Sequence, residues 1–228
     1  MLFRSEPGQP VHVEIDRWGQ ADSLNIVIQH GPIETPALFS ELLPEAVAYV
    51  RVPRFGSGTA ESLGELLTDF SKRAGGLKGF ILDLRGNSGG LLDEAVKVVD
   101  LLVDDTGVPI VSQVSGGGRP GREYNATAGR LITCPTMILV NGWSASSSEV
   151  VAGALQDLKR ATILGTRTYG KGVSQQRLDV PASVNSLVGG NASVQLANFS
   201  LRLPSGRLCH VPRDSRGSVT VGQRRGIE

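Results

Sequence analysis

The segment 144–148 carries four serines directly after a short apolar run, where a predicted strand gives way to a predicted helix. The unpaired N–H groups and the positive dipole end of a helix N-terminus stabilise a developing alkoxide and a tetrahedral oxyanion, as a nucleophilic serine requires. Simple capping explains the same pattern, because serine is favoured at an N-cap and Glu149 could complete a capping box. The segment alone leaves capping and nucleophilic catalysis both open.

A nucleophilic serine also needs a base, and Lys171 is a candidate that stands between two glycines. Burial without a carboxylate partner lowers the pKa of a lysine from about 10.4 toward neutrality, so that the amine can accept a proton. No acidic residue occurs from 161 to 178. Because side chains alternate along a strand, Gln175 is expected on the same face as Lys171, where it could orient the amine without adding charge. A solvated turn lysine is the alternative.

The three histidines do not suggest a metal site. His12, His30 and His210 stand apart from any cluster of acidic or cysteine residues at metal-ligand spacing. A surface or turn position is the simpler interpretation for each, and a Ser-His-Asp enzyme would have to recruit one of them from far away in the sequence. The sequence therefore predicts neither a metal nor another cofactor.

Two further motifs are incomplete. Residues 165–171 nearly spell a P-loop, but residue 172 is glycine where the magnesium-binding serine or threonine is needed, and the chain then alternates like a strand. Residues 142–146 imitate a nucleophile elbow but end in serine where glycine is needed, and only His210 lies downstream as a partner. Nucleotide binding and a histidine-assisted elbow are both disfavoured.

The composition is typical of a folded α/β protein and disfavours nucleic-acid binding. The 228 residues include 23 basic and 22 acidic side chains, which gives a formal net charge of +1 and no sign of a polyanionic partner. The 29 glycines indicate many tight turns. No apolar run approaches the roughly 20 residues of a membrane helix, and residues 1–10 do not resemble a signal peptide. Cys134 and Cys209 are too few for a disulfide-built fold, and their spacing does not decide whether they pair.

Hydrophobic periodicity predicts the elements that must position these residues. The expected strands are 11–15, 24–28, 48–52, 79–84, 109–114, 136–140, 161–164, 173–180 and 193–203. The expected helices are one that begins with Thr59 as its N-cap, one that includes 92–103, and one at 146–158. Segments 30–46 and 116–130 are interpreted as a connector and a loop. Strands that alternate with helices in this way predict an α/β fold with a largely parallel sheet.

Five stretches of the chain resemble one known family. They are 49–52, 79–96, 144–157, 169–172 and 204–207, and they include Gly-Phe-Ile-Leu-Asp-Leu-Arg-Gly-Asn-Ser-Gly-Gly, Ser-Ala-Ser-Ser-Ser-Glu and Tyr-Gly-Lys-Gly. In this order and spacing they resemble the carboxyl-terminal processing peptidases (tail-specific proteases, S41 serine peptidases) across roughly residues 47–210. Several long motifs match at once, so the resemblance is specific.

The resemblance implies an α/β, ββα-type (ClpP/crotonase-like) peptidase core with a mostly parallel sheet. It implies that Ser146 is the nucleophile, that Lys171 is the general base and that Gln175 positions the lysine. The implied oxyanion hole consists of backbone N–H groups, those of Ser147 and of either Gly89 or Gly90. The implied reaction is cleavage of polypeptides near a free C-terminus through an acyl-enzyme, with no cofactor and no metal.

By comparison with the family, the chain has four expected parts. They are the closing strands of a truncated PDZ-like domain (1–31), a linker (32–46), the peptidase core (47–210) and a polar C-terminal extension (211–228). In the family a PDZ domain senses the substrate tail, and most of its peptide-binding groove is missing from this sequence. Trp143 stands where a smaller residue is common, which bears on access to the nucleophile, and Ser147 replaces a usual alanine.

The resemblance implies a polypeptide partner with a free C-terminus and no nucleic acid, and it leaves open a homo-oligomer or an adaptor protein. It also implies an extracytoplasmic location, in the periplasm, the cell envelope or a lumen, although the given chain carries no signal peptide. One alternative belongs to a different class of function. A chain with most of its PDZ domain missing could be a catalytically silent fragment, or a binding and assembly module on the peptidase fold.

Overall fold

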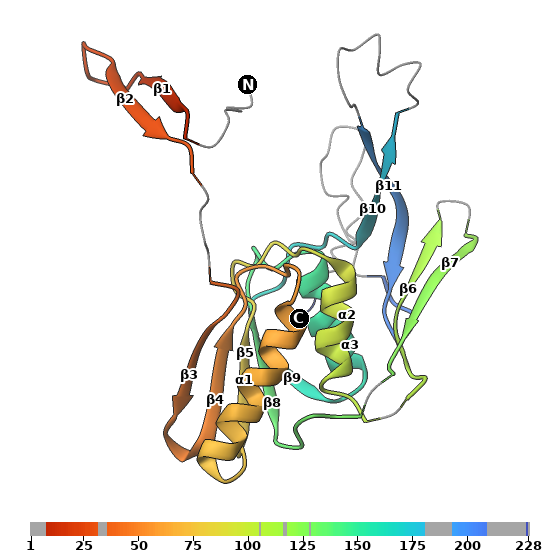
Figure 1. Ribbon diagram of the computed structural model, residues 1–228. Coiled ribbons are helices and arrows are strands. Elements are labelled where there is room, and N and C mark those ends of the chain that lie inside the picture. The colour runs from red at the N-terminus through yellow and green to blue at the C-terminus, as the bar shows by residue number, and fades with distance from the viewer. Residues whose placement is uncertain are drawn as a thin grey trace. The chain divides into compact units, whose positions relative to one another are not determined.

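The computed structural model describes residues 8–31, 36–104, 106–115, 118–127, 129–180, 193–208 and 227 (Figure 1). The chain forms two compact units, Met1–Pro36 and Ala37–Glu228. Of the features predicted from the sequence, His210, Cys209 and nearly all of the extension 211–228 lie outside the described residues. The four expected domain boundaries stay a prediction.

The described residues of the first unit, 8–31 and 36, form one β-hairpin. Strand β1 (Pro10–Ile15) pairs with β2 (Leu24–Gln29) in antiparallel register, as the alternating pattern predicts. Leu24, Val27 and Ile28 are exposed, and none of the described residues of this unit is buried. Two strands alone bury too little apolar surface to be stable in water. The described part of this unit therefore has no core of its own.

The second unit is built on a five-stranded sheet with the order β3-β4-β5-β8-β9. These strands are Phe39–Leu43, Val47–Arg51, Gly79–Asp83, Thr136–Val140 and Ala161–Gly165. Neighbouring strands from β4 to β9 run parallel, whereas β3 pairs with β4 in antiparallel register. Strand β3 lies in the segment that the sequence analysis interpreted as a connector, because flanking prolines and weak alternation hid its pattern.

A second sheet of four strands is antiparallel throughout, with the order β10-β11-β6-β7. These strands are Val173–Asp179, Ser193–Arg202, Pro109–Ser115 and Pro120–Asn125. The prediction of a largely parallel sheet therefore describes only the first sheet, and the fold as a whole is mixed. The prediction of a loop throughout 116–130 is wrong, because β7 folds back on β6 and obtains its pairing from that neighbour rather than from its own strand propensity.

Three helices lie beside the five-stranded sheet, namely α1 (Thr59–Ala74), α2 (Leu92–Asp100) and α3 (Ser147–Asp157), and α2 contacts both of the others (Figure 1). The N-cap of α1 is Gly58 in a left-handed conformation, so the prediction of Thr59 is wrong. Thr59 begins the helix and bonds Gly56, while the Ala60 N–H donates to Glu94 of α2. Helix α2 ends earlier than predicted.

The core lies between the helices and the five-stranded sheet and continues to the base of the second sheet. Its largest fully buried side chains come from all of these elements: Phe55, Leu63, Leu67, Phe80, Leu82, Leu84, Leu102, Ile110, Ile138, Leu155, Leu201 and Ile227. Ile227, far along the chain, joins residues of α3 and β11 in this cluster. The core therefore fixes the ends of β5 and β8, where the segments 86–90 and 141–146 begin.

Candidate active site

Ser146 stands at the N-cap of α3, immediately after the turn that follows β8. Its backbone has φ 56° and ψ −117°, a conformation that side-chain-bearing residues rarely adopt. Such a conformation costs of order 1–3 kcal/mol and persists only where the surroundings enforce it, which is a pattern seen at functional sites. The side chain of Ser146 is half-buried and reaches a cavity.

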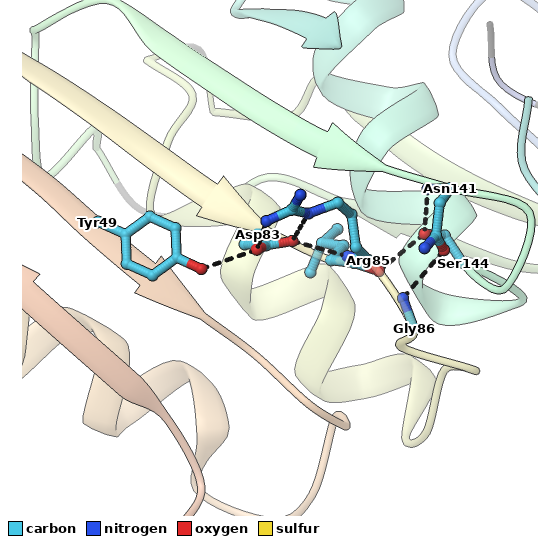
Figure 2. A network of polar contacts seen from close by, with 7 residues as sticks. Tyr49, Asp83, Arg85, Gly86, Asn141 and Ser144 are labelled. Atoms are coloured by element: carbon cyan, nitrogen blue, oxygen red, sulfur yellow. Dashed lines mark hydrogen bonds and ion pairs between the residues drawn. The ribbon is translucent and has the colours of Figure 1, made fainter. Parts of the chain in front are cut away.

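The turn before Ser146 is held by a network of short hydrogen bonds, part of which is drawn in Figure 2. The Ser144 hydroxyl donates to the Leu84 carbonyl at 2.7 Å and accepts from the Asn141 N–H at 3.0 Å. The Asn141 side-chain oxygen accepts from the N–H groups of Gly86 and Trp143, at 3.0 and 3.1 Å. These bonds tie the end of β8 to the end of β5, so the serine segment and the glycine turn keep a fixed distance.

Two glycines of the turn 86–90 lie where no side chain fits. A Cβ on Gly89, whose φ is 105°, would stand 2.8 Å from the Cβ of Ser146. A Cβ on Gly90, whose φ is 151°, would collide with the carbonyl oxygen of Phe55. The backbone of the glycine turn therefore approaches Ser146 directly, which only glycine permits here.

The side chain of Asn87 decides which N–H groups of this turn are available. It is fully buried, donates to the Val52 carbonyl at 2.8 Å and accepts from the Gly89 N–H at 2.8 Å. The N–H groups of Gly90 and Ser147 have no acceptor among the residues that the structure describes. The sequence could not choose between Gly89 and Gly90, and this geometry leaves the Gly90 N–H as the available one.

Glu149, in the first turn of α3, joins the serine segment to the lysine segment. Its carboxylate is fully buried and accepts four hydrogen bonds. One oxygen accepts from the Thr168 hydroxyl and the Gly170 N–H, each at 2.6 Å, and the other accepts from the N–H groups of Lys171 at 2.7 Å and Ser146 at 2.9 Å. A single carboxylate thus fixes the backbone of both segments. Burial raises the pKa of Glu149 above its ordinary value, although the four hydrogen bonds oppose the shift.

One cavity of about 910 Å³ brings all of the predicted site residues together. Its lining includes Ser146, Ser147, Gly89, Gly90, Lys171 and Gln175, and also two exposed aromatic residues, Trp143 and Tyr169. Lys171 is half-buried and Gln175 is exposed, so the lysine is less buried than the sequence analysis supposed for a base. Among the described residues that line it, none is acidic.

The argument from strand alternation does not hold between Lys171 and Gln175. Strand β10 begins only at Val173, so Lys171 lies before the strand and alternation along β10 does not include it. Lys171 and Gln175 nevertheless both line the cavity. The register with β11 shifts between Ser174 and Gln175, where β11 contributes one additional residue. The additional residue belongs to β11, so this bulge bends β11 and not the strand that carries Gln175.

Sequence analysis did not identify Glu149 as a link to the lysine segment, nor Thr168 as its partner. The capping-box position of Glu149 was visible and correctly implies the bond from the Ser146 N–H. The bonds from Thr168, Gly170 and Lys171 come from residues about twenty positions along the chain, and no local pattern encodes them. The signal available in the sequence was that Glu149 begins an apolar helical segment and has no basic residue nearby to pair with it.

Other candidate features carry less weight. No group of histidine, cysteine and acidic residues suited to a metal occurs within the described residues, where His12 and His30 are both exposed. Cys134 is a free, buried cysteine, and burial raises the pKa of its thiol. Within the described parts of the chain, no helix is long and apolar enough to cross a membrane.

Comparisons with known proteins agree on one family. The model described as "Peptidase family S41" matches residues 46–212. A carboxy-terminal-processing protease of Bartonella bacilliformis is 34% identical over 90% of this chain and 45% of its own length. The carboxy-terminal processing protease CtpA of Bacillus subtilis is 30% identical over 76% of this chain and 36% of its own length. A solved photosystem II D1 C-terminal processing protease superposes with a TM-score of 0.67 and 29% identity, over 90% of this chain and 54% of that one. The chain thus spans about half the length, or less, of these relatives.

Proposed function

Because the chain belongs to peptidase family S41, we propose that it is a serine endopeptidase that cleaves polypeptides near their C-terminus through a dyad of Ser146 and Lys171. The family membership confirms the resemblance drawn from the sequence motifs. The observation that carries the proposal is the shared cavity. Two segments that lie 25 positions apart, one with a serine in a strained N-cap conformation and one with a lysine, meet in one cavity. Beside them lie the N–H groups of Gly90 and Ser147, which have no acceptor within the described parts of the chain.

In the proposed reaction, the neutral amine of Lys171 takes the proton of the Ser146 hydroxyl as the oxygen attacks the scissile carbonyl. The lysine then gives this proton to the departing amine, and an ester links Ser146 to the N-terminal part of the substrate. Water, activated by the same amine, hydrolyses the ester and restores the serine. Gln175, which lines the same cavity, is the proposed positioning residue for the lysine.

The negative oxygen of the tetrahedral intermediate needs two preorganised donors. We assign this role to the N–H groups of Ser147 and Gly90, since the Gly89 N–H already donates to Asn87. Gly89 has a different function in this scheme, because its missing side chain leaves room for Ser146. Removing one donor of such a pair costs about 10²–10³ in kcat in serine peptidases.

The substrate class follows from the names of the relatives, which are C-terminal processing proteases. We propose polypeptides with a free, apolar or small C-terminal tail, and a location outside the cytoplasm; one relative is named a chloroplastic processing peptidase. The expected homo-oligomer or adaptor stays a prediction.

The decisive experiment is turnover of an unstructured polypeptide by the wild type, Ser146→Ala and Lys171→Ala, with Lys72→Ala as a matched control on the exposed end of α1. Both site variants should lose turnover, and the control should keep it. Unchanged turnover in either site variant refutes the dyad. A wild type that binds the polypeptide without cleaving it favours the silent or binding module instead.

A further inference from the structure

Ile227 is packed onto α3 beside the catalytic cavity but does not line it. Its side chain is 1% exposed, and a Cβ on Gly153 of α3 would lie 2.8 Å from its Cδ1 and 2.5 Å from a methyl of Leu203. Gly153 therefore provides the space that Ile227 and Leu203 fill. The only residue described after 208 is thus held as firmly as a core residue.

The backbone of Ile227 pairs with Thr168 in both directions. The Ile227 N–H donates to the Thr168 hydroxyl at 2.8 Å, and the Ile227 carbonyl accepts from the Thr168 N–H at 3.2 Å. A backbone N–H can only donate, so the hydroxyl must accept this bond and its single proton stays available. That proton goes to Glu149, at 2.6 Å.

These bonds form a continuous path from Ile227 to both proposed catalytic residues. The path runs through the Thr168 hydroxyl to one oxygen of Glu149, and the other oxygen accepts the N–H groups of Ser146 and Lys171. All of its central atoms are buried, where hydrogen bonds polarise one another and an unpaired group is costly. Loss of one hydrogen bond on this path therefore weakens the next one.

We propose that Ile227 is a positioning residue for the reaction, which acts by orienting the Thr168 hydroxyl toward Glu149 and thereby fixing the Lys171 backbone relative to Ser146. This inference rests on the proposed dyad and names a part of the chain that controls it. With Ile227 in place, the Thr168 hydroxyl donates its proton to Glu149 and accepts a hydrogen bond from the Ile227 N–H. Without Ile227, water reaches the Thr168 hydroxyl and competes with Glu149 for its proton.

The first test removes the hydroxyl without changing the shape of residue 168. Thr168→Val deletes the bonds to Glu149 and from Ile227, whereas Thr168→Ser keeps both. We expect kcat to fall by about 10- to 100-fold in Thr168→Val, because small displacements of catalytic groups have effects of this size. KM should change by less than about threefold, since the cavity lining is untouched. Thr168→Ser should stay within about threefold of the wild type in kcat.

The second test acts on Ile227 itself. Ile227→Ala should lower kcat while Ile227→Val restores most of it, because valine still fills the space over Gly153. Leu66→Ala, on α1 and outside the cavity, is the control for lost packing. All rates are divided by the concentration of Ser146 that reacts with a serine-directed fluorophosphonate, so that unfolded molecules do not count.

The outcomes separate this inference from the proposed function. If Ser146→Ala retains activity, the dyad itself is wrong. If Ser146→Ala is inactive while Thr168→Val matches Thr168→Ser in kcat per reactive serine, the dyad stands and the positioning role of Ile227 is overturned. The role is also overturned if Ile227→Ala behaves like Leu66→Ala, with a lower Tm and an unchanged kcat per reactive serine.

Discussion

Two buried carboxylates, Asp83 and Glu149, lie near the end of the five-stranded sheet that carries the candidate active site, and they are stabilised in opposite ways. Asp83, at the end of β5, accepts from Tyr49 at 2.8 Å and from the Arg85 guanidinium at 2.7 and 2.9 Å (Figure 2). Glu149 is just as buried but accepts only from neutral donors, three N–H groups and one hydroxyl. One carboxylate has a cation as its partner and the other has none among the described residues.

The pKa values of the two carboxylates are shifted in opposite directions. Burial alone would raise the pKa of Asp83, but the bonds from Arg85 and Tyr49 outweigh burial and hold it below its ordinary value. At Glu149 burial is the largest cause and its pKa is raised in spite of four hydrogen bonds. The contacts of Asp83 therefore stabilise its ionised form, whereas burial destabilises the ionised form of Glu149.

This contrast suggests why each carboxylate is where it is. A cation beside Glu149 would compete with the backbone N–H groups of Ser146 and Lys171 for the carboxylate oxygens. Neutral donors keep both oxygens directed at the two segments that must meet. We therefore expect the contacts of Asp83 to contribute mainly to the stability of the fold, and those of Glu149 to position the Ser146 and Lys171 segments relative to each other.

The largest expected effect is on catalysis at Glu149. In Glu149→Gln one oxygen becomes an NH₂ group, which cannot accept from the N–H groups that face it. We expect kcat per reactive serine to fall by about 100-fold or more, because the lysine and serine segments lose their common anchor. Steady-state kinetics with active-site titration measures this.

The control for that variant is Glu94→Gln, which changes a buried glutamate that bonds α1 instead of the site. Glu94→Gln should lower Tm with little change in kcat per reactive serine. Equal losses of kcat in the two variants would mean that Glu149 supports the fold in general and has no special role at the site.

The second effect concerns stability at Asp83. Asp83→Asn removes the charge that Arg85 and Tyr49 contact, and hydrogen bonds to charged groups are worth about 1.5–3 kcal/mol each. We expect a loss of about 2 kcal/mol in the free energy of unfolding, since the half-exposed Arg85 side chain can turn to water. Urea unfolding measures the loss, and kcat should stay near the wild-type value. A large loss of kcat at unchanged stability would reverse the assignment of the two regions.

The sequence supported the local features of both regions but not their connections. The serines before α3, the lysine between glycines and the glycine turn were all visible as patterns, and the structure brings them to one cavity. Spacing and residue type suffice there, because turns and helix starts are encoded locally. The Tyr49–Asp83 and Glu149–Lys171 bonds join residues 34 and 22 positions apart, and only the folded sheet brings them together.

The errors in secondary structure have the same origin. Strands β3 and β7 were missed because each depends on the neighbour with which it pairs, β4 and β6. Gly58 rather than Thr59 caps α1 because Glu94, on another helix, accepts the Ala60 N–H that a side-chain cap would have served. In each case tertiary contacts overrode a local preference.

The third effect is a pair of opposite trends with pH. The folded pKa of Asp83 lies below its ordinary value of about 3.9, so its stabilising contribution is present above that value and is lost as pH falls through the folded pKa. The folded pKa of Glu149 lies above about 4.3, so stability falls as pH rises from there through the folded pKa. The stability of the wild type relative to Asp83→Asn should therefore rise with pH, so that this gap widens, and its stability relative to Glu149→Gln should fall. Gaps that move in the same direction would remove the contrast.

The smallest expected effect separates the two donors of Asp83. Tyr49→Phe removes one neutral bond to the carboxylate and leaves the bonds from Arg85 in place, so the free energy of unfolding should fall by about 1 kcal/mol. Because the tyrosine also helps to hold the pKa of Asp83 down, the same variant should reduce the widening of the gap with pH that Asp83→Asn reveals. Urea unfolding of Tyr49→Phe at two pH values measures both. If Tyr49→Phe costs as much as Asp83→Asn, the tyrosine bond and not the arginine pair is what stabilises this carboxylate, and the two regions differ less than their charges suggest.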